Sequence, residues 1–155
     1  MFKTRITPRV GETDGLRHIT NTTLPCWFET GRTELIKIFV PTNELTYKKW
    51  NIILVHMDFN FLKQTYFGYD VEIRTYVTKI GKHSFTVHQE AWQNGLIRAT
   101  GNSTMIYYDY IKQKSKIIPE EIRNELKKHL VDLKELEEKN KIEMKNNNEN
   151  KEFKE

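Results

Sequence analysis

Three polar side chains suited to acyl-transfer chemistry lie within eight residues of one another: Asp14, His18 and Asn21. They directly precede a segment, starting near Thr22, whose pattern is typical of a helix. The first N–H groups of a helix have no partner inside the helix and carry partial positive charge. A polarised carbonyl or a developing oxyanion can rest on the backbone N–H of Asn21 or Thr22 while Asp14 attacks or activates water.

Each of these residues also has a purely structural interpretation. Asp14-Gly15 is a turn dipeptide, and an aspartate in a loop is more often a turn former than a catalyst. His18 can pack the loop or orient Asp14, and the side chain of Asn21 can simply turn or cap the chain. The hypothesis of an active site therefore depends on the whole segment together with the helix that follows it.

The helix is predicted between Thr22 and Val40, where apolar residues recur every three or four positions. Threonines at its start can cap it, and Pro41 prevents its continuation. Gly31 in its middle costs about 0.5–1 kcal/mol relative to alanine. We therefore expect a sheet or a partner helix to pack closely against the backbone at this glycine.

From Asn51 onward the hydrophobic period changes to two, which is typical of half-buried strands. Gly81-Lys82 and Asn94-Gly95 are turn signals between consecutive strands. The predicted strands of this antiparallel meander cover residues 52–63, 70–80, 83–93 and 96–111, with 5–10 as a fifth. The fold class is therefore α+β, with a long helix against one sheet.

A second helix is predicted from Pro119, with an apolar stripe that runs to Leu136. It is expected to pack on the outside or the edge of the sheet. From residue 139 onward the chain is rich in Asn, Lys and Glu, and its apolar surface is too small to offset the entropy of ordering. We therefore expect one domain over residues 1–138 and a frayed or disordered charged tail over 139–155.

Composition narrows the classes of function. The 155 residues have a formal net charge of +4, and residues 1–130 alone carry +6, which indicates an anionic partner. The basic residues are scattered and not gathered into the block that a nucleic-acid arm uses. No apolar run is long enough to span a bilayer, and no secretory leader is evident. With Cys26 as the single cysteine, the chain is expected to be soluble and cytoplasmic, without a disulfide or a metal cluster.

Several motifs, taken together, resemble those of one enzyme family. In chain order they are Thr13-Asp14, His18-Ile19 with Asn21, Trp27-Phe28-Glu29-Thr30-Gly31-Arg32, Gly68-Tyr69-Asp70, Ile80-Gly81-Lys82-His83-Ser84-Phe85, Ala99-Thr100-Gly101 and Ile118-Pro119-Glu120. Over residues 4–125 the sequence resembles the 4-hydroxybenzoyl-CoA thioesterase-like acyl-CoA thioesterases, which are hotdog-fold enzymes. The stretch from Asp14 to Arg32 is the most specific part.

The resemblance implies a five-stranded antiparallel sheet wrapped around a long central helix, with a C-terminal helix. It also implies a homodimer or homotetramer with the active site at a subunit interface. The catalytic aspartate of the family falls on Asp14, and its backbone donor falls on Asn21. The implied substrate is an acyl-CoA, so coenzyme A is part of the substrate, and neither a cofactor nor a metal is expected.

The resemblance further implies basic residues that meet the CoA phosphates. Lys82 is the best match, and the other expected substrate contacts are Lys79, Arg98, Arg17, Ser84 and Thr22. Arg17 stands where the family has glycine, and it can lower the pKa of Asp14, face the solvent or grip a CoA phosphate. Lys82 and Ser84 also have structural interpretations as residues of a turn and a strand start.

Several alternatives stay open at this point. Asp14 can act as a general base on water or attack directly to give a mixed anhydride. The substrate can be a thioester of CoA or of an acyl carrier protein, since the basic body suits an acidic carrier. The chain can also be a hotdog lyase or an acyl-CoA-binding protein without catalytic activity. The identity of the acyl chain is not encoded in any motif.

Overall fold

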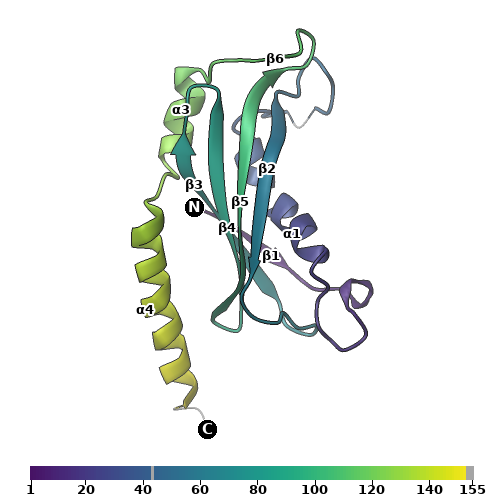
Figure 1. Ribbon diagram of the computed structural model, residues 1–155, viewed down its shortest axis with the longest axis vertical. Coiled ribbons are helices and arrows are strands. Elements are labelled where there is room, and N and C mark those ends of the chain that lie inside the picture. Colours follow the sequence, from purple (N-terminus) through teal and green to yellow (C-terminus); the bar gives the residue numbers. More distant parts are fainter. Residues whose placement is uncertain (43, 153–155) are drawn as a thin grey trace.

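The structure, a computed structural model, describes residues 1–42 and 44–152 and is built around one antiparallel sheet with α1 against one of its faces (Figure 1). The strands are β1 (Phe2–Ile6), β2 (Ile52–Phe61), β3 (Val71–Ile80), β4 (Ser84–Gln93), β5 (Leu96–Asp109) and the short β6 (Lys114–Ser115). Their order across the sheet is β1-β3-β4-β5-β2, and β6 pairs with the end of β5. This confirms the expected α+β hotdog arrangement.

The predicted strands agree with the observed ones to within two residues at most of their ends. The exception is the first strand, which runs from Phe2 to Ile6 and not over residues 5–10. Pro8 has no N–H to donate to a neighbouring strand, and the short 3-10 helix η1 (Val10–Glu12) follows it. The chain therefore leaves the sheet earlier than its alternating pattern predicts.

The predicted helix over 22–40 is shorter and is interrupted. It consists of α1 (Thr23–Gly31) and α2 (Thr33–Ile36), which meet at Arg32. Two side chains of the sheet enter here, because Gln89 Nε2 donates to the Phe28 carbonyl at 2.8 Å and Thr75 Oγ1 donates to the Gly31 carbonyl at 3.0 Å. These bonds tie the end of α1 to β3 and β4.

The expected close packing at Gly31 is confirmed. A Cβ atom at this position would lie 2.5 Å from Ile73 Cγ2 and 3.0 Å from Gln89 Nε2, so only glycine fits without movement. The core on this face of the sheet forms two clusters, one around Phe28 with Ile73 and one around Leu35 with Phe85. The tight contact fixes the distance of α1 from the sheet and hence the position of its first turn.

The second predicted helix is in fact two helices, α3 (Glu120–Lys127) and α4 (Leu133–Glu152). Between them the chain runs beside β3, where Val77 N–H donates to the His129 carbonyl at 3.1 Å and Val131 N–H donates to the Val77 carbonyl at 2.9 Å. β1 pairs with β3 only as far as Thr75, opposite Phe2, and the segment around Leu130 takes over as the neighbour of β3 at Val77. A stripe of leucines alone does not reveal such a break.

Helix α4 corrects the expectation of a frayed tail over residues 139–152. It lies along the outside of the sheet (Figure 1) and is held there by polar contacts. The Arg74 guanidinium makes two bonds of 2.8 Å to Glu143, and Asn140 Nδ2 donates to Glu90 at 2.5 Å. Residues 153–155 of the predicted tail lie outside the described residues, and the domain limit at 138 stays a prediction. Within residues 1–42 and 44–152, no helix is both long and apolar enough to cross a membrane.

Candidate active site

The loop before α1 folds as a tight hairpin that holds Asp14 opposite His18. The Asp14 N–H donates to the His18 carbonyl at 3.0 Å, and Thr13 pairs with Ile19 in an antiparallel bridge. Gly15 makes the reversal with a φ of 87°, which is a conformation that glycine adopts easily. Two of the three predicted catalytic residues are therefore brought together by backbone pairing.

The Asp14 carboxylate has both a turn role and an accessible oxygen. Its Oδ1 accepts a hydrogen bond from the Leu16 N–H at 2.9 Å, while its Oδ2 lies 3.9 Å from Nδ1 of His18. The Asp14 side chain is 39% exposed and that of His18 is 30% exposed. The hydrogen bond to Oδ1 confirms the interpretation of Asp14 as a turn former. The other oxygen, Oδ2, is left available to a reacting group.

The amides at the start of α1 are open. Neither the Asn21 N–H nor the Thr22 N–H donates a hydrogen bond to any atom of residues 1–42 or 44–152. Thr22 is the N-cap residue, yet its side chain makes no capping bond. Asn21 lines a cavity of about 270 Å³ that also contacts Leu24 and Phe61. Two unfilled donors therefore face the surface at the positive end of the helix.

A second hollow lies beside the hairpin. It has a volume of about 370 Å³, and its lining includes Arg17, Tyr66 and Arg98. The Arg98 guanidinium lies 6.0 Å from the centre of the Tyr66 ring. Asp14 lines neither of these two cavities. Within a single chain, neither cavity therefore reaches from the Asp14 carboxylate to the open amides.

The remaining predicted contacts lie at the other end of the sheet. Lys79, Lys82 and Ser84 surround the β3–β4 turn, whereas the Asp14 hairpin lies near the β4–β5 turn. The ten residues of β4 separate these ends by about 30 Å. Of the basic residues predicted to meet the CoA phosphates, Arg17 and Arg98 are therefore the two at the Asp14 end of one chain.

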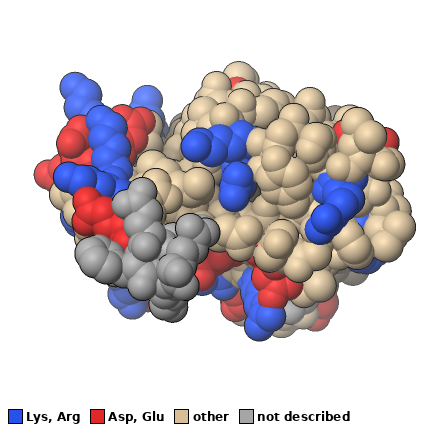
Figure 2. Space-filling model, turned by 90° about the horizontal axis from the view of Figure 1, so that it is seen from below, with Lys and Arg blue, Asp and Glu red and all other residues tan. Residues whose placement is uncertain are grey.

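The end that carries the hairpin has no continuous basic patch in the part that the structure describes. Figure 2 views the molecule from below: over most of this face the Lys and Arg side chains stand as separate groups, and at its left side they lie among Asp and Glu side chains. This agrees with the scattered basic residues in the sequence. Any anion bound here would meet single side chains and backbone donors.

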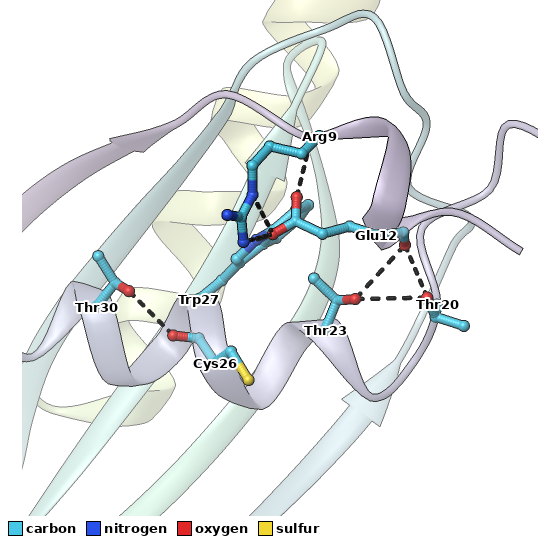
Figure 3. A network of polar contacts seen from close by, with 7 residues as sticks. All are labelled: Arg9, Glu12, Thr20, Thr23, Cys26, Trp27 and Thr30. Atoms are coloured by element: carbon cyan, nitrogen blue, oxygen red, sulfur yellow. Dashed lines mark hydrogen bonds and ion pairs between the residues drawn. The ribbon is translucent and has the colours of Figure 1, made fainter.

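One residue near the site was missed by the sequence analysis. Glu12, two positions before Asp14, is only 14% exposed and lies between the hairpin and α1 (Figure 3). Burial alone would raise the pKa of its carboxyl, but hydrogen bonds from the Arg9 N–H, the Arg9 side chain and Trp27 outweigh burial and lower that pKa. The carboxylate is therefore held in its ionised form. Nothing in the sequence distinguishes Glu12 from an exposed loop carboxylate.

The groups gathered here suit chemistry at a carbonyl. A carboxylate can accept a proton or attack, and open amides can receive the negative charge that develops on oxygen. No group of three or more His, Cys, Asp or Glu side chains arranged to hold a metal is found among residues 1–42 and 44–152. Cys26 is exposed on α1 and contributes no core packing.

Comparisons with known proteins give a consistent result. A family model described as the thioesterase-like superfamily matches residues 8–126. A predicted thioesterase from Bacillus stearothermophilus is 40% identical, with a TM-score of 0.80 over 84% of this chain and 97% of that chain. No curated protein matches the sequence significantly.

Two solved structures of lower identity share the fold. One is a thioesterase from Thermus thermophilus complexed with coenzyme A and Zn, with 18% identity and a TM-score of 0.72 over 82% of this chain and 92% of that chain. The other is a hypothetical protein from Staphylococcus aureus in complex with CoA, with 12% identity and a TM-score of 0.75 over 85% of this chain and 87% of that chain.

Proposed function

The chain belongs to the thioesterase-like superfamily, and on that premise we propose that it hydrolyses an acyl-CoA thioester to a free acid and CoA. The observation that carries the proposal is the Asp14 carboxylate on the hairpin that leads into α1, followed by two open amides at Asn21 and Thr22. Within the superfamily, the motifs from Asp14 to Arg32 favour the 4-hydroxybenzoyl-CoA thioesterase-like branch.

Two routes fit this geometry. In the first, Asp14 takes a proton from water, the water oxygen bonds to the acyl carbon, the C–S bond breaks and the proton passes to the departing sulfur. In the second, an Asp14 oxygen bonds to the acyl carbon and expels the CoA thiolate, after which water cleaves the mixed anhydride. His18, 3.9 Å from Asp14, orients the carboxylate in both routes. Mass spectrometry of protein quenched in acid during turnover would detect acylated Asp14 only in the second.

The amides at the start of α1 supply the oxyanion donors in both routes. Negative charge on the thioester oxygen would be placed against the Asn21 and Thr22 N–H groups, where the partial positive charge of the helix end adds to the attraction. One such donor typically lowers a barrier by about 2.7–4 kcal/mol. Because these donors are backbone groups, their contribution depends on where α1 begins and not on the side chains at these positions.

A homodimer would complete the site. β2 is an edge strand in the described chain, and it exposes Leu54, Val55 and Phe61, which are 42%, 52% and 49% exposed. If β2 pairs with β2 of a second copy about a two-fold axis, opposite ends of the two chains become neighbours. The partner's Lys82 and Ser84 would then approach the Asp14 hairpin, which is consistent with their role as substrate contacts.

The test is an assay of purified protein on a panel of acyl-CoAs with a thiol-trapping dye. We expect thiol release by the wild type and a loss of about 10²–10⁴-fold in kcat for Asp14→Asn. The matched control is Asp109→Asn, because the Asp109 carboxylate also accepts turn hydrogen bonds, from the Ile111 and Lys112 N–H groups at 3.0 and 2.9 Å. Activity of Asp14→Asn within about threefold of this control would refute the role of Asp14.

The same assay separates the alternatives. Residues 1–130 carry a net charge of +6, which also suits an acidic acyl carrier protein, so acyl-carrier thioesters form a second substrate arm. Binding of acyl-CoA without thiol release would identify a binding protein and overturn the proposal. A lyase would need a histidine and a carboxylate on opposite sides of the substrate, whereas His18 and Asp14 share one hairpin.

A further inference from the structure

The Glu12 side chain joins the Asp14 hairpin to helix α1. Its Oε1 accepts the indole N–H of Trp27 at 3.2 Å and the Arg9 guanidinium at 2.9 Å, and its Oε2 accepts the Arg9 backbone N–H at 2.7 Å (Figure 3). Trp27 lies on α1 and is only 3% exposed. The carboxylate is therefore anchored to a side chain that the core holds in place.

The Glu12 backbone makes a second link on the other side of the hairpin. Its carbonyl accepts the Thr20 N–H at 2.9 Å, the Thr20 hydroxyl at 2.7 Å and the Thr23 hydroxyl at 3.5 Å. Thr20 directly precedes the open amide of Asn21, and Thr23 is the first residue of α1. One residue thus contacts the chain on both sides of the open amides, and Asp14 follows it by only two positions.

From these contacts we propose that Glu12 is a positioning residue, which fixes the Asp14 carboxylate relative to the amides of Asn21 and Thr22; this inference rests on the proposed thioesterase function. Both Glu12 oxygens are engaged by Arg9 or Trp27, so neither is free to attack a substrate. A displacement of about 1 Å at a reacting group can lower a rate by about 10²-fold. Glu12 therefore acts through the geometry of the neighbouring groups.

The kinetic test compares Glu12→Gln and Glu12→Ala with wild type. Glutamine keeps an acceptor oxygen for Trp27, so we expect kcat to fall about tenfold for Glu12→Gln and about 10²-fold for Glu12→Ala. KM should change less than about threefold in both, because Glu12 does not touch substrate. The matched control is Glu34→Gln on α2, whose carboxylate is 53% exposed and pairs with Lys37, and its kinetics should equal those of wild type.

A second variant covers the case in which Glu12→Ala does not fold. Trp27→Phe keeps an aromatic ring in the core and removes the N–H that holds the carboxylate, and the smaller ring also leaves a cavity in the core. We expect it to lower kcat a few-fold with KM nearly unchanged. A rise in KM with kcat unchanged in Glu12→Gln would show contact with substrate, and kcat equal to that of wild type would show no role; either result overturns the inference.

A measurement without substrate separates this inference from the proposed function. In Glu12→Gln, the backbone amides of Asp14 and Thr20 should exchange with solvent about tenfold faster than in wild type, while the amides of β4 keep their rates. If wild type releases thiol and Asp14→Asn does not, but Glu12→Gln equals wild type in both measurements, only the inference fails. If wild type releases no thiol, the proposed function fails. In that case the exchange measurement still tests the inference, because unchanged exchange rates of the Asp14 and Thr20 amides in Glu12→Gln would refute the link through Glu12.

Discussion

Replacing Gly31 with alanine would test the close approach of α1 to the sheet. The new Cβ would lie 2.5 Å from Ile73 Cγ2, 3.0 Å from Gln89 Nε2 and 3.3 Å from Ile73 Cβ. Carbon atoms in contact are normally about 3.5–4.0 Å apart, so Ile73 or the helix must move by about 1 Å. Both neighbours are buried, at 0% and 1% exposure, and have little room to yield.

Two opposing contributions set the expected size of the effect. Adding a methyl group to a filled core typically costs about 1–3 kcal/mol. Alanine in place of a helical glycine recovers about 0.5–1 kcal/mol. We therefore expect Gly31→Ala to lower the free energy of unfolding by about 1–2 kcal/mol, which corresponds to a fall in Tm of about 2–8 °C for a chain of this length.

Urea unfolding followed by circular dichroism measures this effect, and Gly11→Ala is the matched control. A Cβ on Gly11 meets nothing within 4 Å, and its free energy of unfolding should stay within about 0.5 kcal/mol of wild type. Because Gly31→Ala would displace α1, it should also lower thioesterase activity. If Gly31→Ala is as stable as Gly11→Ala, with the same dependence on urea, the sheet does not constrain α1 as described.

Three further predictions concern the contacts beneath and along α4. Asn140→Ala removes the 2.5 Å bond to the buried Glu90 carboxylate and should lower the free energy of unfolding by about 1–3 kcal/mol in urea; a change below about 0.3 kcal/mol would contradict this. Burial alone would lower the pKa of His88, but hydrogen bonds to Glu90 and Asn102 outweigh burial and raise it. The stability from this histidine is thus fully present below its unfolded pKa of about 6.5 and is lost as pH rises through the folded value. Wild type should therefore lose more stability than His88→Gln between pH 6 and pH 9, and parallel pH profiles would contradict this. Glu143→Gln weakens the pair with Arg74, and because Glu143 is 42% exposed the loss should be only about 0.5–1 kcal/mol by the same unfolding assay, with a loss above 2 kcal/mol as the contrary result.

The parts of the fold that follow from local patterns could be predicted from the sequence. The alternation of β3 and β4 and the turns at Gly81 and Asn94 depend on residues close together in the chain. The close approach at Gly31 also followed from one residue, because a glycine in a helix interior usually has a packing reason. These predictions are confirmed by the positions of the strands and by the Ile73 contact.

The parts that depend on distant residues were missed. The break after α1 involves Thr75 and Gln89, which lie 44 and 61 positions from the carbonyls they contact. The predicted tail contains few apolar residues, yet α4 is held by Asn140 and Glu143, whose partners are on β3 and β4. Polar anchors of this kind leave no hydrophobic periodicity in the sequence.

The candidate site shows the same division. The Asp14 hairpin and the open amides follow from a short continuous motif, whereas the partners of Glu12 are known only once α1 is in place. The large distance between Asp14 and Lys82 likewise appears only in the folded sheet, because the two residues lie beside opposite ends of β4. Completion of the proposed site by a second copy is expected from the family resemblance alone, because it depends on contacts between two chains.

The position of α4 limits how copies of this molecule could assemble. Arg74 and Glu90 point away from α1, since their strand neighbours Ile73 and Gln89 pack beneath the helix, and α4 therefore shields the convex side of β3 and β4. Two molecules cannot stack these convex sides back to back while α4 remains seated. A second copy that approached this side of β3 and β4 would meet α4 before it met the strands.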